Sequence, residues 1–266
     1  LCSYAAYLAV QEDFLSNPTK RGEYLFCLNR ELMLLSQLNG LKSYNGNNEM
    51  HFDAYLPNLQ VVTARSYKNS LKGLFVAAKG GNNGESHNHN DVGSFIIYQD
   101  SEPMLVDPGV GTYRKETFNN ATRYNIWTMQ SCYHNLPRIN GVNQMYGKKY
   151  AAKDAKETAN NKRVAFSLDI ASAYPDSAKI KSWVRTIDFV RGKYVDVAES
   201  YELGSIIAPT EIMLITPVEP VVTNGKIILH SSKIHSTIMF NPSELDVSSE
   251  CINMNDEKMT HIWNKL

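Results

Sequence analysis

The chain has 266 residues, 43% of them hydrophobic, which is enough to bury the core of one large domain or two small ones. Its 27 basic and 27 acidic residues cancel, and this argues against a nucleic-acid binder, because such proteins usually carry a basic excess. No apolar run reaches the roughly 18 residues that a membrane-spanning helix needs. The four cysteines are too widely spaced to predict a zinc ribbon or a disulfide framework.

Residues 1–39 are predicted to form two amphipathic helices. Apolar residues recur there at three- and four-residue steps in two segments, which are separated at Asn17-Pro18, where proline breaks a helix. Residues 40–49 are rich in Gly and Asn and indicate a linker, so we predict a domain boundary near residue 50. The chain starts at Leu1 without an initiator methionine or a signal peptide, and we interpret it as a piece of a longer or processed protein.

From residue 51 onwards the pattern is that of short β-strands separated by polar turns. Within residues 164–170 the apolar side chains alternate, as expected of a strand with one side in a core. Tight turns are predicted at residues 191–193 and at Asn224-Gly225, and residues 114–131 are predicted to be helical or irregular. These features together predict an antiparallel sandwich or barrel. The expected strands are residues 61–66, 73–79, 94–98, 103–107, 164–170, 182–190, 194–201, 211–218, 220–230 and 236–240.

The densest group of chemically versatile residues lies between residues 81 and 113. Two apolar runs around a polar turn at residues 99–102 predict a β-hairpin, whose two ends lie side by side. The segment before the first strand carries His87 and His89, and the segment after the second carries Asp107. In an extended chain the rings of a His-x-His pair lie on one face, so two imidazoles and a carboxylate could converge.

A third imidazole, His134, precedes an extended segment that ends in a turn at Asn140-Gly141. Two histidines and a carboxylate suit Zn²⁺, with water or a polar side chain in the fourth position. Alternatives stay open, because each histidine could instead be an ordinary core or surface residue. Asp91 could bind metal, although an aspartate in such a loop more often anchors the backbone. Cys132, two residues before His134, could replace Asp107 as a ligand.

Four short motifs taken together resemble the β-sheet domain of the heparinase II/III-like polysaccharide lyases, a family that includes heparin, heparan sulfate and alginate lyases. They are His-x-His at 87–89, Asp-Pro-Gly at 107–109, His-Asn at 134–135 and Asn-Gly-x-x-Gln at 140–144. The resemblance implies a mainly β fold, with a large antiparallel β-sandwich (supersandwich) at residues 51–266. Residues 1–50 would then be the last helices of an (α/α) toroid plus a linker, and the substrate cleft would lie between toroid and sandwich.

Matched position by position, the resemblance also implies roles for individual residues. His89, Asp107 and His134 correspond to the family's ligands of a structural zinc, which is thought to brace the cleft rather than attack the bond. His87 corresponds to a histidine that faces the substrate, and Tyr124 falls near a cleft tyrosine of some members. Both are therefore catalytic candidates.

The implied partner is an acidic polysaccharide, together with the toroid of the same full-length protein. Asn88, Arg123 and Arg138 are our candidate substrate-binding residues, and solvated surface charge is the competing explanation for each arginine. The other basic residues near the histidines are Arg114, Lys115, Lys148, Lys149 and Lys153.

The implied reaction is β-elimination at a uronic acid. A base removes the C5 proton, donors neutralise the sugar carboxylate, and an acid assists the departing 4-linked oxygen. His87 suits either carboxylate neutralisation or proton transfer, because histidine titrates near neutral pH. In the family the principal acid and base come from the toroid, so we expect this chain alone to be an incomplete catalyst. A periplasmic or secreted bacterial location is implied, and oligomerisation is left open.

Two competing functions remain at this point. One is a non-catalytic carbohydrate-binding sandwich in which zinc is purely structural. The other is a cupin-like metal enzyme, whose scaffold also carries a His-x-His pair. Cupins place a glutamate a few residues after the second histidine, whereas here the nearest acid is Asp91 and the better-placed acid is Asp107.

Overall fold

The computed structural model describes residues 50–231 and 233–263. The chain divides after Met50, and residues 51–266 form the second unit. The predicted N-terminal helices and linker lie outside the described residues, so their assignment to a toroid stays a prediction. No helix in the described part of the chain is long and apolar enough to cross a membrane.

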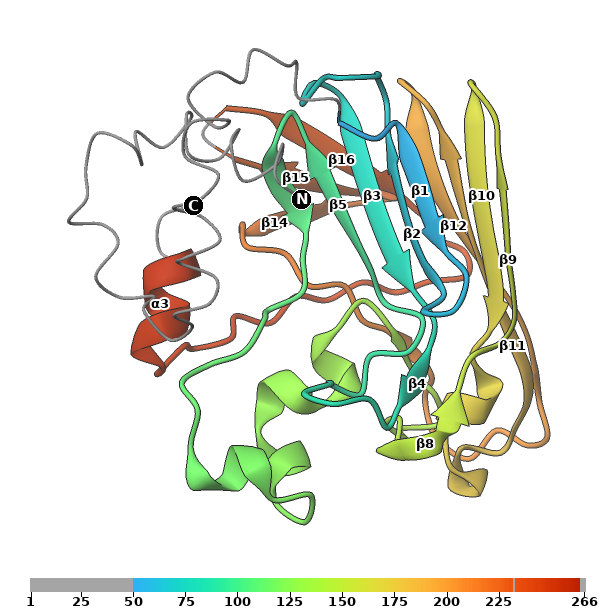
Figure 1. The fold of residues 1–266 in the computed structure, drawn as a ribbon, viewed down its shortest axis with the longest axis vertical. Helices are drawn as coiled ribbons and strands as arrows, with labels where there is room; N and C mark the ends of the chain where they lie inside the picture. Colours follow the sequence, from blue (N-terminus) through green and yellow to red (C-terminus); the bar gives the residue numbers. More distant parts are fainter. Residues whose placement is uncertain (1–49, 232, 264–266) are drawn as a thin grey trace, which may run out of the picture. The chain divides into compact units, whose positions relative to one another are not determined.

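One layer of the second unit is a five-stranded antiparallel sheet in the order β1-β2-β3-β5-β6 (Figure 1). Side chains alternate across it, so that Val62 and Ala64 on β2, and Val76 and Ala78 on β3, are buried. The predicted hairpin is confirmed as β5 and β6, joined at Asp100 and Ser101 with positive φ values of 50° and 71°. The strands are β1 (Asp53–Leu56), β2 (Val61–Arg65), β3 (Leu74–Lys79), β5 (Phe95–Gln99) and β6 (Glu102–Leu105).

A second antiparallel sheet, in the order β12-β11-β10-β9, packs on the first. The predicted alternation is present on β10, where Val164, Phe166 and Leu168 are buried. The rings of Tyr55 and Phe166 lie 6.0 Å apart between the two sheets, and Trp183 on β11 is fully buried. The expected β-sandwich is therefore confirmed. The strands are β9 (Lys153–Ala159), β10 (Arg163–Asp169), β11 (Ile180–Val190) and β12 (Tyr194–Leu203).

The C-terminal part contributes a three-stranded sheet and one helix. Strands β14 (Pro220–Thr223) and β15 (Lys226–His230) meet at the predicted Asn224-Gly225 turn, and β16 (His235–Met239) completes the sheet. Leu229 of β15 joins the common core. The helix α3 spans Glu257–Trp263, and the indole nitrogen of its last residue donates to the carbonyl of Pro108 at 3.0 Å.

The strand predicted at residues 211–218 is only partly present. It is reduced to β13 (Glu211–Ile212), which pairs with β7 (Pro137–Arg138). Beyond it, the amide of Ile215 donates to the side chain of Asn135 at 2.7 Å instead of to a neighbouring strand. Pro217 then has no amide hydrogen to donate to a ladder, so the strand cannot extend.

The irregular excursion predicted at residues 114–131 is a chain of short 3₁₀ helices, shown in green in Figure 1. It lies at the same end of the sheets as the two-stranded pair of β4 (Asn82–Asn83) and β8 (Gly147–Ala151). This end of the sandwich carries the site. The 3₁₀ helices are η2 (Lys115–Phe118), η3 (Arg123–Asn125), η4 (Trp127–Met129), η5 (Ser131–Tyr133), η6 (Ala171–Ala173) and η7 (Asp176–Ala178).

Candidate metal centre and adjoining pockets

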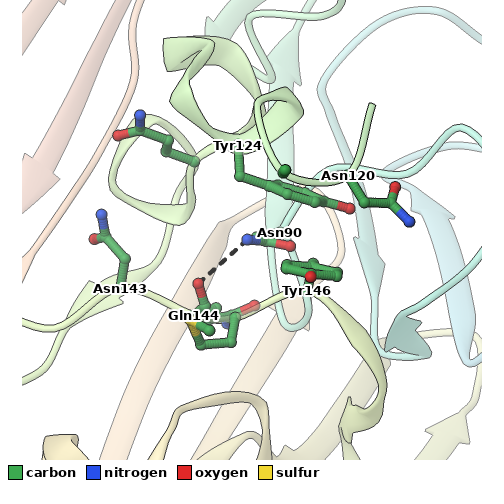
Figure 2. Close-up of a pocket in the computed structure, with 9 residues that line it drawn as sticks. Asn90, Asn120, Tyr124, Asn143, Gln144 and Tyr146 are labelled. Atoms are coloured by element: carbon green, nitrogen blue, oxygen red, sulfur yellow. Dashed lines mark hydrogen bonds between the residues drawn. The ribbon is translucent and has the colours of Figure 1, made fainter. Parts of the chain in front are cut away.

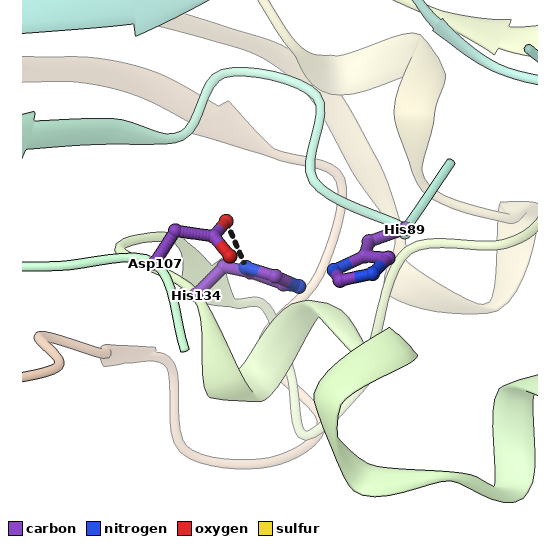
Figure 3. A group of neighbouring side chains, drawn as sticks. All are labelled: His89, Asp107 and His134. Atoms are coloured by element: carbon purple, nitrogen blue, oxygen red, sulfur yellow. Dashed lines mark hydrogen bonds and ion pairs between the residues drawn. The ribbon is translucent and has the colours of Figure 1, made fainter. Parts of the chain in front are cut away.

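Three of the candidate side chains converge at this end of the sandwich (Figure 3). His89 comes from the loop before β5, Asp107 follows β6, and His134 follows η5. One possible ligand atom from each residue lies within 4.8 Å of the other two. The His134 Nδ1 is 2.9 Å from the Asp107 Oδ2, and the rings of His89 and His134 are 5.3 Å apart. The structure thus brings together the three residues that the sequence indicated as ligands.

The hydrogen bond of the His134 Nε2 determines whether the Nδ1 of the same ring carries a hydrogen or a lone pair. His134 is fully buried, and its Nε2 lies 3.1 Å from the carbonyl oxygen of Thr128. A carbonyl only accepts hydrogen bonds, so Nε2 carries a hydrogen and a neutral ring turns the lone pair of Nδ1 toward the Asp107 carboxylate. That arrangement is repulsive unless a proton or a cation lies between them. A ring that donates its other N–H to a backbone carbonyl is also the common arrangement of metal-bound histidine.

The protonation of the group suits a divalent cation. Burial acts to raise the pKa of Asp107, but the hydrogen bond and charge of His134, together with the amide of Gly109, overcome it and lower the pKa to about 2. Burial, and then the charge of His134, lower the pKa of His89. A carboxylate and a neutral imidazole are the forms in which these groups bind metal. The donor set therefore fits Zn²⁺.

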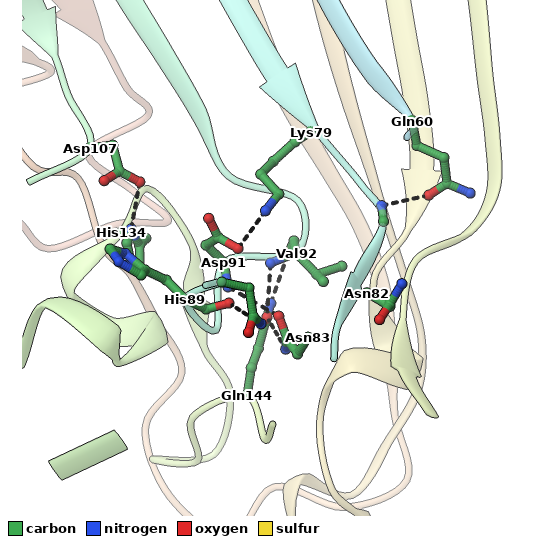
Figure 4. A network of polar contacts seen from close by, with 12 residues as sticks. Gln60, Lys79, Asn82, Asn83, His89, Asp91, Val92, Asp107, His134 and Gln144 are labelled. Atoms are coloured by element: carbon green, nitrogen blue, oxygen red, sulfur yellow. Dashed lines mark hydrogen bonds and ion pairs between the residues drawn. The ribbon is translucent and has the colours of Figure 1, made fainter. Parts of the chain in front are cut away.

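A buried glutamine holds the loop of His89 in place (Figure 4). The Gln144 Oε1 accepts hydrogen bonds from the Asn83 Nδ2 at 3.0 Å and from the Val92 amide at 3.1 Å. Its Nε2 donates to the Val92 carbonyl at 2.8 Å. The backbone amide of Gln144 donates to the hydroxyl oxygen of Ser131 at 2.9 Å. Gln144 therefore links the loop of His89 to the segment that leads into His134.

A buried asparagine, Asn135, holds the segment before Asp107 in place. The Asn135 Nδ2 donates to the carbonyls of Phe95 at 2.7 Å and Val106 at 3.1 Å. The fully buried Arg185 donates in turn to the carbonyl of Asn135 at 2.6 Å and to that of Gly93 at 2.7 Å. In the sequence, Asn135 and Gln144 stand out only as members of motifs, and Arg185 was not predicted to contribute. The sequence signal available for these two residues was their position, because Asn135 directly follows the predicted ligand His134 and Gln144 follows the predicted turn at Asn140-Gly141.

His87 does not lie in extended chain, so the expected extended His-x-His geometry is wrong. Its backbone is left-handed, with φ of 57°, and its side chain is exposed. The side-chain alternation of a strand therefore does not apply to His87 and His89, because it requires extended backbone. His87 instead lines a pocket of about 260 Å³, together with Asn88, Arg123 and Tyr124.

Arg123 and Asn88 hold the loop together rather than projecting freely. The guanidinium of Arg123 is buried and donates to the carbonyls of Asn88 and Thr117, each at 2.6 Å. The Asn88 Nδ2 donates to the carbonyl of His89 at 2.8 Å. The Tyr124 hydroxyl lies 3.4 Å from the Asn88 Oδ1, and burial raises the pKa of Tyr124. Tyr124 also lines the pocket of His87.

The remaining candidates lie outside the group formed by His89, Asp107 and His134. Arg138 is exposed, forms an ion pair with Glu211 at 3.4 Å and lines neither of the two pockets described. Asp91 pairs with the Lys79 Nζ at 2.7 Å, so its carboxylate anchors the loop through an ion pair instead of through backbone amides. Cys132 accepts a hydrogen bond from the Asn143 Nδ2 at 3.4 Å and does not join the three converging residues.

A larger pocket of about 460 Å³ adjoins that of His87 (Figure 2). Tyr124 and Asn120 line both pockets, and the ring of Tyr124 stacks on that of Tyr146 with centroids 4.9 Å apart. Of its residues, the sequence indicated Tyr124 as a candidate and Gln144 as a member of a motif. The lining is Asn90, Asn120, Ala121, Tyr124, Gln130, Asn143, Gln144, Met145 and Tyr146.

Solved structures of bacterial heparinases share this fold. Heparan sulfate lyase HepC from Pedobacter heparinus is 17% identical, with a TM-score of 0.58 over 76% of this chain and 31% of its own. A heparinase III with methylated lysines is 13% identical, with a TM-score of 0.58 over 76% of this chain and 31% of its own. The chain thus spans about a third of the length of these proteins. No curated protein sequence matches it significantly.

A family model provides the assignment. Residues 61–204, more than half of the chain, match the model of the heparinase II/III-like C-terminal domain. That range includes the three converging residues, together with Asn135 and Gln144, whose side chains hold the neighbouring loops. With the sandwich fold and the sequence match in agreement, this chain belongs to the heparinase II/III-like family and contains its C-terminal domain.

Proposed function

We propose that this chain is the zinc-containing part of a polysaccharide lyase that cleaves uronic-acid-containing polysaccharides by β-elimination. The observation that carries the proposal is the convergence of His89, Asp107 and His134 beside the pocket of His87. Family membership supports the lyase class, and the donor set supports zinc. Zinc, when bound by these three residues, would supply a fixed positive charge that stabilises the loops at the cleft.

The residues of the pocket support distinct parts of the reaction. His87 is exposed at the pocket, so its imidazole can reach a sugar bound there and either neutralise the carboxylate or move a proton. Arg123 contributes positive charge from behind the loop, because each of its three nitrogens donates to a backbone carbonyl. Tyr124 stays protonated at neutral pH, since burial raises its pKa, and its hydroxyl can donate to a sugar oxygen.

Catalysis is expected to be incomplete in this chain. The principal acid and base are expected from an N-terminal toroid, and residues 1–50 would supply only its end. The whole protein would act on an acidic polysaccharide in the bacterial periplasm or outside the cell. Binding without cleavage is the second candidate for the isolated chain, and the uncharged lining of the larger pocket favours it. The cupin alternative is set aside, because residues 61–204 match another family.

Metal analysis tests the zinc centre directly. His134→Ala and His89→Ala are expected to abolish bound zinc in elemental analysis and to lower the melting temperature, because a ligand bound only by the folded state stabilises it. His51→Ala is the matched control, since this histidine is exposed and lies outside the group. Unchanged zinc content in both variants would remove the site.

Turnover tests the expected division of labour. A uronate polysaccharide incubated with the chain should give little new ultraviolet absorbance from unsaturated product. His87→Ala should abolish any residual rate and weaken binding of the polysaccharide. Full turnover by the chain alone would show that no toroid residue is needed, and wild-type binding and residual rate in His87→Ala would exclude a role for this histidine.

A further inference from the structure

Two histidines outside the candidate metal centre face each other across the hairpin of β15 and β16. His230 is the last residue of β15, His235 is the first of β16, and the register of the strands pairs them directly. Residues that lie opposite each other in an antiparallel pair carry their side chains on the same face. The Nδ1 atoms of the two rings are in hydrogen-bond contact, and the ring centroids lie 4.4 Å apart. We call these two residues the histidine pair.

The histidine pair is separate from the group formed by His89, Asp107 and His134. Its turn lies beside the turn of the β5–β6 hairpin, where Lys233 forms an ion pair with Glu102. His89 precedes β5 and Asp107 follows β6, so both lie at the opposite end of that hairpin. Strand β5 has five residues, which is roughly 16 Å of extended chain. One ion therefore cannot be shared by the two groups.

The surrounding contacts hold the two rings close together. Leu229, next to the first histidine, is buried in the common core, and the hydroxyl of Ser236, next to the second, donates to the Gln99 Oε1. Within the turn, the amide of Ser231 donates to the carbonyl of Ile234 at 3.0 Å, and the hydroxyl oxygen of Ser231 accepts from the amide of Ile234 at 3.2 Å. A ligand that binds both rings therefore needs to order little of the chain.

The spacing of the two nitrogens suits a divalent transition metal ion. Imidazole is a ligand that Zn²⁺, Cu²⁺ and Ni²⁺ share. Two nitrogens that each bind an ion at about 2.0–2.1 Å lie about 3 Å apart, so rings already in hydrogen-bond contact need to move little. Both side chains are exposed, which lets an ion enter from solvent, and the neighbouring Lys233 ammonium is paired with Glu102. A hydrogen bond from one neutral ring to the other is the competing explanation for the contact.

The pair differs from the candidate metal centre in its charge. Among residues 50–231 and 233–263, no carboxylate, thiol or third imidazole joins it to make a group of three ligands. Two neutral imidazoles would leave the full charge of the ion uncompensated. A tetrahedral ion would also keep two positions open, and these suit water or an anionic oxygen.

We propose that His230 and His235 form a second metal site, which chelates one divalent transition metal ion between β15 and β16. The ion replaces the hydrogen bond between the rings and links the ends of the two strands. Cu²⁺ binds more tightly than Zn²⁺, as expected for nitrogen ligands without a preference of geometry. The site shares no residue with the proposed zinc centre and does not depend on the proposed function.

Calorimetric titration of the full, chelator-treated and untagged chain with Zn²⁺ and with Cu²⁺ tests the proposal. His134→Ala, which lacks a ligand of the first centre, is expected to keep binding one equivalent of either ion. Adding His235→Ala to it should weaken that binding by more than about tenfold, because a direct ligand contributes more than the about 10–100-fold of supporting partners. His235→Asn should do the same, although it keeps a hydrogen-bonding group beside His230. His51→Ala is the matched control, since this histidine is exposed and outside both groups.

Electron paramagnetic resonance of bound Cu²⁺ adds a readout that a structural role would not change. Two imidazole nitrogens should couple to the copper in His134→Ala, and fewer after either histidine of the pair is replaced. No metal binding by His134→Ala, or binding that His230→Ala and His235→Asn leave unchanged, would overturn the second site and leave the proposed function standing. Circular dichroism identifies any variant that has lost its fold, and the remaining replacements of the pair then decide the result.

Discussion

Replacing Gln144 by leucine is expected to loosen the loop of His89 without touching any of the three converging residues. The side chain of Gln144 is buried and makes two hydrogen bonds with the backbone of Val92 and one with Asn83. Leucine has a similar volume but no polar atom. The substitution therefore removes hydrogen bonds while leaving no large cavity.

The expected loss of stability follows from the groups left unpaired. The Asn83 Nδ2 keeps a second acceptor, the Met145 carbonyl at 3.0 Å, so its loss is small. The amide and carbonyl of Val92 lose the partner that Gln144 provided. Each buried backbone group without a partner costs about 1–3 kcal/mol, which gives about 2–5 kcal/mol in total after the gain from burying leucine. Zinc affinity should fall as well, because supporting hydrogen bonds of a metal site typically contribute about 10–100-fold.

Urea unfolding, followed by tryptophan fluorescence, measures the first effect, because Trp183 is fully buried in the same core. Competition with a chromophoric chelator measures the second. Gln130→Leu is the matched control, since the Gln130 side chain is half-buried and, among the residues that the structure describes, accepts one weak hydrogen bond, from the Cys132 Sγ at 3.7 Å. A loss below about 1 kcal/mol in Gln144→Leu, or an equal loss in the control, would refute the reasoning.

Two further predictions concern the parts around the site. The carboxyl of Asp256 caps helix α3 by accepting a hydrogen bond from the Met259 amide, and loss of such a cap in Asp256→Ala should destabilise the protein by about 1 kcal/mol at neutral pH. The hydrogen bond from the Thr112 amide is the main cause that lowers the pKa of this carboxyl. Because the folded-state pKa is depressed, this contribution is present above about pH 4 and is lost as the pH falls through the folded value, which urea unfolding at several pH values would show. Gly93 has φ of 90°, and an added Cβ would lie 2.7 Å from the Ile170 Cγ2. Gly93→Ala should therefore cost about 1–3 kcal/mol more than Gly141→Ala, where φ is 74° and the nearest atom is 3.6 Å away, and equal losses would contradict this.

The parts of the fold that were predicted correctly from the sequence depend on local patterns. The β5–β6 hairpin and the alternation on β10 follow from side chains within one or two strands, so they are visible in the sequence. The strand expected at residues 211–218 ends at Ile212, and the backbone beyond it is held by Asn135, which is 80 residues from Ile215. No local pattern contains that contact.

The candidate site shows the same limit. The convergence of His89, Asp107 and His134 could be predicted, because the hairpin places two of the segments side by side and the resemblance supplied the third. The direction of His87 could not, since nothing in the tripeptide indicates a left-handed residue, a conformation that is uncommon for histidine. The larger pocket was missed for a different reason. Its lining comes from separate segments, around Asn90, Tyr124 and Tyr146, and only their packing brings them together.

The buried side-chain amides of Gln144 and Asn135 hold the loops of the candidate metal centre in place without an ion. Gln144 holds Val92, three residues after His89, and Asn135 holds Val106, the residue before Asp107. Neither contact involves a ligand atom, so both persist whatever lies between the imidazoles and the carboxylate. A cation held by His89, Asp107 and His134 would therefore leave the backbone in place. Under the proposed function, zinc would add stability to a loop arrangement that already exists, which suits an ion that braces the cleft.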